Sequence, residues 1–195
     1  MEIGEVFYPK TRSQWRRWLN RNHAKKTEIW VRRFKKGTGK PSIRYDDLVE
    51  ECLCFGWIDS TIKKLDDASN VQRVTPRRKT SFLSELNRQR AWKMQAAGLM
   101  TEHGLAPIRD QLGTPEDPWK VPTWLKKRLR EEPAVWTAFS SFPYLYQRLK
   151  IGWIVEAGES RPEEMERRLA HLIKCTRAGK MYGTVPISEG PSVSG

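Results

Sequence analysis

The sequence is poor in the residues that form disulfides and metal sites. It contains three cysteines and three histidines, which are Cys52, Cys54, Cys175, His23, His103 and His171. An odd number of cysteines without a repeated spacing argues against a disulfide framework, and histidines so far apart form no zinc-ligand pattern. We therefore expect no metal and no cofactor, and we expect Cys52 and Cys54 to be small residues on the apolar face of a helix.

Long apolar runs are missing too. No stretch reaches the roughly 18 apolar residues that a membrane-spanning helix needs, so we expect no membrane span. The N-terminal stretch MEIGEVFYPKTRSQW contains no apolar run of the signal-peptide type. We therefore expect a cytoplasmic chain whose thiols stay reduced.

The motifs of several common enzyme classes are absent from the sequence. It has no GxSxG nucleophile elbow and no dinucleotide-binding fingerprint. The Gly-rich basic segment KKGTGKPS, residues 35–42, lacks the spacing of a phosphate-binding loop, so a strand-to-helix turn is the simpler interpretation. Whether the chain is an enzyme stays open at this level.

Positive charge and tryptophan are abundant. Among 195 residues, Lys and Arg number 36 against 23 Asp and Glu, which leaves a net charge of +13, and there are nine Trp. This charge favours anionic partners, but it is spread along the chain rather than gathered in one tail. The partners open to the sequence are a small anionic or polar ligand, a polyanion such as nucleic acid, and another protein.

Hydrophobic periodicity predicts an α+β arrangement for residues 1–110. Strands are expected at residues 5–8, 27–35, 57–63 and 71–75, the last two forming a hairpin around a turn at residues 65–70. In the second strand, Ile29, Val31 and Arg33 alternate with Trp30, Arg32 and Phe34. Helices are expected from Thr11, at residues 45–55, from Thr80 or Ser81 to Ala97, and from Thr101. Hairpins of short strands predict a largely antiparallel sheet.

The rest of the chain has helical patterns only. Residues 111–122, QLGTPEDPWKVP, predict a linker between two modules. Helices are expected at residues 122–132, 133–139 and 143–158, and a last helix should open at Ser160 with a capping box completed by Glu163. This helical module, residues 123–181, is followed by a Gly-, Pro- and Ser-rich tail, residues 182–195, which we expect to be disordered.

Polar side chains of both signs are concentrated among aromatic residues in the stretch from Cys54 to Met100. Asp59 is the candidate general base or orienting carboxylate. The candidate ligand-binding residues of the α+β part are Trp30, Trp57, Arg77, Arg78, Ser84, Asn87 and Arg88. In one interpretation they line a cleft for an anionic or polar ligand, with Trp57 as a stacking wall. In the other, Asp59 pairs with Arg77 or Arg78 and holds the hairpin to the following helix.

The last helix carries a basic stripe. Its members are Arg167, Arg168, His171, Lys174 and Arg177. Such a stripe lies along a phosphate backbone in some proteins and is simply a solvated face in others. The sequence contains no named nucleic-acid-binding motif to favour the first alternative.

Four stretches carry a resemblance to a known family: WRRWLNRNHAKKTEIWVRRFKK, LCFGWIDSTIKKLDD, TPRRKTSFLSELNRQRAWKMQAAGLMTEHGL and ESRPEEMERRLAHL. With them the chain resembles the YdeI/OmpD-associated family, also called bacteriocin-protection proteins. It departs from the family pattern at Leu83, Leu99 and Ser160, where Trp, Arg and Thr are usual. The resemblance implies a role in resistance to bacteriocins or cationic antimicrobial peptides, and it implies no reaction and no cofactor.

The sequence therefore predicts a small protein of the stress- or bacteriocin-protection type with a non-catalytic cleft for an anionic or polar ligand. Two alternatives remain open: an enzyme that acts on a small polar metabolite in the same cleft, and a nucleic-acid-binding protein that uses its basic surface.

Overall fold

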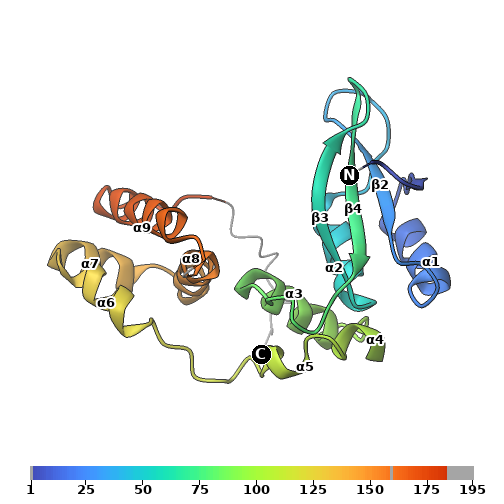
Figure 1. The fold of residues 1–195 in the computed structure, drawn as a ribbon. Coiled ribbons are helices and arrows are strands. Elements are labelled where there is room, and N and C mark those ends of the chain that lie inside the picture. Colours follow the sequence, from blue (N-terminus) through green and yellow to red (C-terminus); the bar gives the residue numbers. More distant parts are fainter. Residues whose placement is uncertain (1, 159, 184–195) are drawn as a thin grey trace, which may run out of the picture. The chain divides into compact units, whose positions relative to one another are not determined.

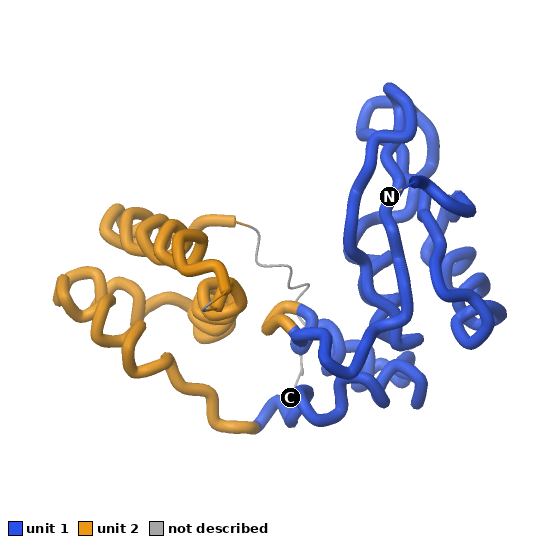
Figure 2. Tube along the Cα trace, viewed as in Figure 1, with its two compact units in different colours: residues 1–83, 87–116 blue, residues 84–86, 117–195 orange. Residues whose placement is uncertain are grey.

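A computed structural model describes residues 2–158 and 160–183, and in this part of the chain four strands and nine helices are present (Figure 1). They are grouped in two compact units. The first contains residues 1–83 and 87–116, and the second contains residues 84–86 and 117–195 (Figure 2). The division after Glu116 lies inside the segment predicted as a linker. Residues 184–195, most of the tail expected to be disordered, lie outside the described residues.

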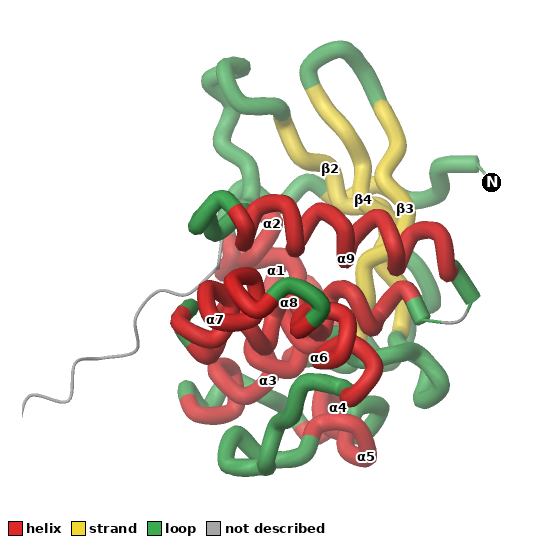
Figure 3. The backbone as a smooth tube through the Cα atoms, turned by 90° about the vertical axis from the view of Figure 1, so that its left-hand side faces the viewer, coloured by secondary structure: helices red, strands yellow, loops and turns green. Residues whose placement is uncertain are grey.

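The first unit contains one four-stranded sheet. Its strands are β1 (Val6–Phe7), β2 (Ile29–Phe34), β3 (Trp57–Lys64) and β4 (Ser69–Pro76). Their order is β1-β2-β4-β3, and Figure 3 shows β2, β4 and β3 side by side. The pairings β2–β4 and β3–β4 are antiparallel and β1–β2 is parallel. The α+β class is confirmed, with one parallel pairing in an otherwise antiparallel sheet.

The predicted hairpin is present, although its loop is shorter than expected. Lys64 ends β3 and Ser69 begins β4. Asp66 closes the turn, because its Oδ1 accepts hydrogen bonds from the backbone N–H of Ala68 at 3.0 Å and from Ser69 Oγ at 2.7 Å. A register shift between Asp59 and Ile62 interrupts the ladder, as a β-bulge does.

Five helices lie wholly or mainly in the first unit. They are α1 (Arg12–Asn22), α2 (Tyr45–Cys54), α3 (Glu85–Ala96), α4 (Glu102–Leu105) and α5 (Arg109–Leu112). The predicted start of α1 is confirmed: Thr11 is its N-cap, and Thr11 Oγ1 accepts from the Gln14 N–H at 3.3 Å. Apolar side chains of α1, α2 and one sheet face form a single core that includes Trp15, Leu48 and Val31. Cys52 and Cys54 lie in this core, as predicted.

Helix α3 begins later than the sequence predicts. The expected start was Thr80 or Ser81, but the first helical residue is Glu85. The side chain of Gln111 explains the difference, because its Nε2 donates to Ser81 O at 3.0 Å and its Oε1 accepts from the Leu83 N–H at 2.8 Å. A residue distant in sequence thus satisfies backbone groups that a helical turn would otherwise pair.

The second unit is helical apart from its connecting segments. Its helices are α6 (Thr123–Arg130), α7 (Pro133–Ser141), α8 (Tyr144–Ala157) and α9 (Pro162–Arg177). Leu125, Leu129, Phe139, Ile154 and Leu169 are among the residues of its core. No helix in the described part of the chain has the length and apolar character needed to cross a membrane.

The predicted capping box of the last helix is wrong. Helix α9 begins at Pro162 after Arg161, with no side-chain capping bond. Ser160 Oγ instead donates to Ala157 O at 3.5 Å. Proline suits the first helical position because its missing N–H would have no intrahelical partner there.

Candidate functional site

The two tryptophans proposed as ligand contacts are both buried. Trp57 is 1% exposed, packs in the core, and donates from its Nε1 to His23 O at 3.2 Å. Trp30 is fully buried on the other face of the sheet, and its Nε1 donates to Glu28 Oε1 at 2.9 Å. Neither ring offers a surface to a ligand, so the stacking wall expected at Trp57 is not available.

Asp59 holds neighbouring polar side chains. Its Oδ2 accepts from Tyr45 Oη at 2.9 Å and from Gln72 Nε2 at 3.1 Å. Within residues 2–158 and 160–183, no ion pair joins Asp59 to Arg77 or to Arg78. Arg78 is exposed, whereas Arg77 is buried and lies close enough for the charge of Asp59 to act on its pKa. The expected ion pair between Asp59 and one of these arginines is therefore not formed among the described residues. Asp59 acts on Arg77 only through its charge, without a direct bond.

The other predicted residues are distributed over two units. Ser84 belongs to the second unit. In the first unit, Asn87 Oδ1 accepts from Arg90 Nη1 at 3.0 Å, and Arg88 Nε donates to Gln111 O at 3.1 Å. Both polar side chains therefore already bond to other residues of the first unit.

Arg33 belongs to a polar cluster with Tyr45, Asp59, Gln72 and Arg77, but it is not among the site residues predicted from the sequence. Its guanidinium carbon lies 5.2 Å from the centre of the Tyr45 ring. The structure gives it no hydrogen bond and no ion pair among the described residues, and its Nε is buried without a partner. Burial lowers the pKa of Arg33, although the nearby Tyr45 and Asp59 oppose this effect. A half-buried cation with so little compensation is unusual in a folded protein.

Two further buried polar atoms near Asp59 have no partner in the described residues. Gln72 is 2% exposed, and its Oε1 accepts no hydrogen bond. Arg77 is 7% exposed; its Nη1 donates to Phe82 O at 3.2 Å, but its Nε is unpaired. Burial lowers the pKa of Arg77, with Asp59 opposing the shift. Arg33 and Arg77, both influenced by one carboxylate, leave positive charge incompletely balanced.

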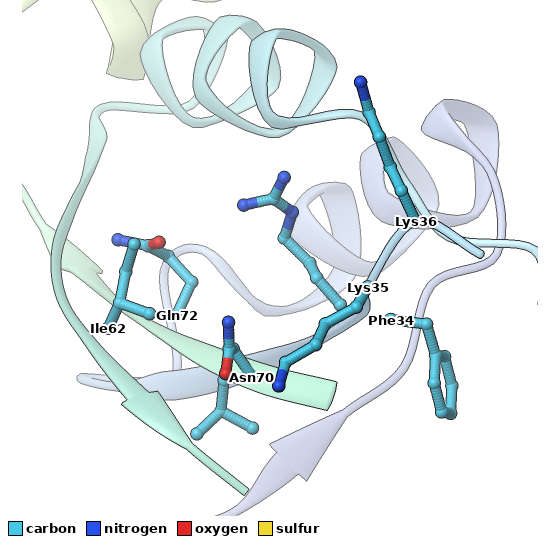
Figure 4. Close-up of a pocket in the computed structure, with 8 residues that line it drawn as sticks. Phe34, Lys35, Lys36, Ile62, Asn70 and Gln72 are labelled. Carbon is cyan, nitrogen blue, oxygen red and sulfur yellow. The ribbon is translucent and has the colours of Figure 1, made fainter. Parts of the chain in front are cut away.

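A pocket of about 220 Å³ lies against this cluster, at the end of β2 and along the hairpin. Its lining residues are Arg33, Phe34, Lys35, Lys36, Ile62, Asn70, Val71 and Gln72. Figure 4 shows the ring of Phe34 turned away from the side chains of Asn70 and Gln72. Three cations and two amides therefore share the lining, and none of the lining residues carries a carboxylate.

The alternation of β2 contained the signal for Arg33. Ile29 and Val31 belong to the core, so Arg33, two residues further along the strand, projects from the same covered face. A charged residue on a buried face requires a partner, a ligand or solvent. The alternation of β2 is thus predictable from the sequence, but Arg33 is not among the predicted site residues.

The basic stripe of α9 is largely paired with acids. Arg167 and Arg168 both contact Glu164, and Arg168 also lies 4.5 Å from the Trp153 ring. Arg177 makes two bonds to Glu132, at 2.9 and 2.6 Å. These pairs reduce the positive charge that this surface offers to a polyanion.

The fold and the pocket define a class: a two-unit α+β protein with a cationic, amide-lined pocket on its sheet unit and a helical second unit. No group of metal-ligating side chains is present among the residues that the structure describes. Residues 7–107 match the model of a domain of unknown function (DUF8412), and the chain belongs to this family. Residues 119–179 match the family described as bacteriocin-protection, YdeI or OmpD-associated.

The predicted resemblance to the bacteriocin-protection family is confirmed for residues 119–179, which form most of the helical unit. Three of the four stretches quoted for the resemblance fall wholly or largely in residues 7–107, and ESRPEEMERRLAHL falls in residues 119–179. A comparison with curated proteins and one with solved structures gave no match. The pocket residues all lie in the part matched by the domain of unknown function.

Proposed function

We propose that this protein acts in protection against bacteriocins by binding a small anionic ligand in the pocket beside Arg33. The match of residues 119–179 to the bacteriocin-protection family supports the general role. The ligand-binding part of the proposal depends on the first unit, where the pocket lies. Ligand pockets use a few placed polar groups to orient their ligand, and this lining offers two amides and three cations.

One observation carries the proposal: the guanidinium of Arg33 is half-buried without a hydrogen-bonding partner in the described chain. Desolvating a cation costs several kcal/mol unless an opposite charge or good acceptors compensate it. Lys35 and Lys36 add two more positive charges to the same lining. A bound anion would supply the missing acceptors, and bonds to charged groups are among the stronger hydrogen bonds in proteins.

Binding without catalysis suits this geometry. A general base must lie within hydrogen-bonding reach of the proton that it removes. Asp59 is not a lining residue of the pocket, and its Oδ2 already accepts from Tyr45 and Gln72. These contacts favour an orienting role for Asp59 over the catalytic role considered from the sequence.

The test compares binding of inorganic phosphate by calorimetry in the wild type, Arg33→Met and Arg78→Met. Methionine keeps an unbranched apolar side chain and removes the charge, so we expect Arg33→Met to weaken binding by about tenfold or more, since bonds to charged groups contribute about 1.5–3 kcal/mol. Arg78 is exposed and outside the lining, so Arg78→Met should bind within about twofold of the wild type, as expected for a distant surface charge.

Thermal unfolding of the same variants separates function from structure. A cation that serves the ligand rather than the fold is a cost to the empty protein, so Arg33→Met should melt at the same temperature as the wild type or higher. Equal phosphate binding by the wild type and Arg33→Met would contradict the proposal. So would a wild type that binds no phosphate.

A further inference from the structure

The amide of Gln72 has an orientation set by its surroundings. Its Nε2 donates to Asp59 Oδ2 and to the backbone oxygen of Ser60, both at 3.1 Å. The Ser60 oxygen is a pure acceptor, and an ionised Asp59 is one too, so a flipped amide would place oxygen against oxygen. The Oε1 atom must therefore be the end of the amide that points elsewhere.

That oxygen accepts no hydrogen bond from any described residue, although Gln72 is almost fully buried. Figure 4 shows it on the side of the amide nearer Lys36. A buried acceptor without a hydrogen bond is costly. It requires a donor, whereas the unpaired guanidinium of Arg33 requires an acceptor.

The two requirements occur close together. In the β2–β4 pairing, Val31 lies opposite Gln72 and Arg33 lies opposite Asn70. Arg33 and Gln72 are therefore diagonal neighbours on one sheet face, a relation in which Cα atoms are about 7–8 Å apart and long side chains meet. Asn70, directly across from Arg33, adds an amide that offers both donors and an acceptor.

From this pairing we infer that the ligand carries a hydrogen-bond donor, a hydroxyl or an amino group, within a few bonds of its anionic group; the inference rests on the function proposed above. The anionic group contacts Arg33 and the pocket lysines, and the donor contacts Gln72 Oε1. A pocket of about 220 Å³ is smaller than the usual range of about 300–1,000 Å³ for drug-sized ligands. The ligand class is a small hydroxylated or aminated anion, such as a hydroxyalkyl phosphate.

Asp59 is a positioning residue in this scheme. Tyr45 donates to its Oδ2, and burial together with Asp59 raises the pKa of Tyr45 to about 12, so its hydroxyl stays a donor at neutral pH. Asp59 in turn fixes the Gln72 amide. An Asn at this position offers a donor as well as an acceptor, so only the Ser60 oxygen would still oppose a reversed amide of Gln72.

The experiment measures the affinity of two matched probes, glycerol 3-phosphate and propyl phosphate, which carry the same anionic group with and without hydroxyls. We expect the wild type to prefer glycerol 3-phosphate by about tenfold, the value of one well-made hydrogen bond. In Gln72→Met the preference should fall to within twofold, with the affinity for propyl phosphate retained. In Asp59→Asn the preference should fall by less than in Gln72→Met, because the Ser60 oxygen still orients the amide, while binding of propyl phosphate persists.

The outcomes distinguish the two proposals. Equal binding of both probes by the wild type would overturn the inferred donor and leave anion binding intact. An undiminished preference in Gln72→Met would also overturn it, because the hydroxyls would then be recognised elsewhere. Failure of the wild type to bind either probe would refute the anion-binding function itself, and the inference with it.

Discussion

Half-buried arginines in the first unit fall into two groups. Arg12 donates to Glu51 at 2.6 Å and to Glu50 at 2.6 Å; burial alone would lower its pKa, but these bonds more than offset the effect and raise it. Arg33 and Arg77 have no carboxylate at bonding distance among the described residues, and burial lowers the pKa of both. Arg12 therefore stabilises the fold, whereas burial of Arg33 and Arg77 is unfavourable, and the proposed anionic ligand would reduce this unfavourable free energy.

Gly56 should tolerate no side chain. Its φ is +70°, and an added Cβ would lie 2.3 Å from the backbone oxygen of His103. Gly98 has a similar φ of +66° with open space around it. We expect Gly98→Ala to cost about 1–2 kcal/mol, the penalty of a left-handed backbone, and Gly56→Ala to cost about 4 kcal/mol or more, since a backbone atom must also move.

Urea unfolding of the two variants measures this difference. The left-handed backbone contributes about equally to both, so the excess loss in Gly56→Ala reports the steric contact alone. Equal losses in the two variants would show that the end of α2 relaxes freely and that the contact with His103 is unimportant.

At the residue scale, the sequence predicts that certain polar side chains lie near one another, but it does not predict which of them form hydrogen bonds. Asp59 and Arg77 were selected because opposite charges recur among aromatics after Cys54. Gln72 is a direct partner of Asp59 because of the register in which β4 pairs with β3, and the sequence pattern does not determine this register. Arg33 is not among the predicted site residues, although the alternation of β2 places it on the same face as Val31, because its burial depends on the helices that cover that face.

At the scale of elements, α1 and α2 are joined by a buried carboxylate. Glu51 is 1% exposed and accepts from Arg12 Nε at 2.6 Å and from Arg16 Nη1 at 2.7 Å. Removing one member of a buried pair leaves the partner charge uncompensated, so Glu51→Gln should cost about 3 kcal/mol or more. Glu102, which pairs with Arg109 on the surface, is the matched control; Glu102→Gln should cost less than about 1 kcal/mol.

Chemical unfolding of both variants, followed by tryptophan fluorescence, checks the α1–α2 prediction. High salt should leave the loss in Glu51→Gln nearly unchanged, because buried pairs are poorly screened. A small loss in Glu51→Gln, similar to that in Glu102→Gln, would mean that water reaches this network and that apolar contacts alone hold the two helices.

Helix and strand positions were predictable where the signal is local. Thr11 caps α1 by accepting from the N–H three residues later in the chain. Thr101 caps α4 in the same way, with its Oγ1 accepting from the Gly104 N–H at 3.1 Å. The start of α3 was not predictable, because Gln111 supplies the competing hydrogen bonds from 30 residues away. The failed cap at Ser160 has a local cause: Pro162 fixes the start of α9.

For the whole molecule, the two units carry different parts of the functional argument. The link to bacteriocin protection comes from residues 119–179, whereas the cationic pocket lies within residues 7–107, matched by a domain of unknown function. The division after Glu116 lies in a run of Pro and Gly that is visible in the sequence, whereas residues 84–86, predicted as part of the first domain, group with the second unit. The quoted motifs did not predict that the bacteriocin-protection match would lie on the helical unit. Three of the four motifs lie in the first unit, which matches a different family.

The stability of the protein should fall in alkaline solution because buried thiols resist ionisation. Burial, the largest cause, raises the pKa of Cys54 to about 11 from the value of 9.0 expected without it, and also raises that of Cys52. Between pH 9 and 11 the unfolded chain therefore releases protons that the folded chain retains, so the free energy of unfolding decreases as the pH rises through this range. Below pH 9 the thiols are protonated in both states and contribute no pH dependence.

Each thiol in this range contributes a slope of up to about 1.4 kcal/mol per pH unit. We expect urea unfolding of the wild type to show a steeper loss of stability from pH 9 to 10.5 than that of Cys54→Ala or of the double variant Cys52→Ala/Cys54→Ala. At pH 7 the variants should differ from the wild type by a constant packing loss, which serves as the internal control. Lysine deprotonation affects all three proteins alike and therefore cancels in the comparison. If the free energy of unfolding fell in parallel with pH in all three proteins, the two thiolates would be accommodated in the folded core, and these cysteines would not limit alkaline stability.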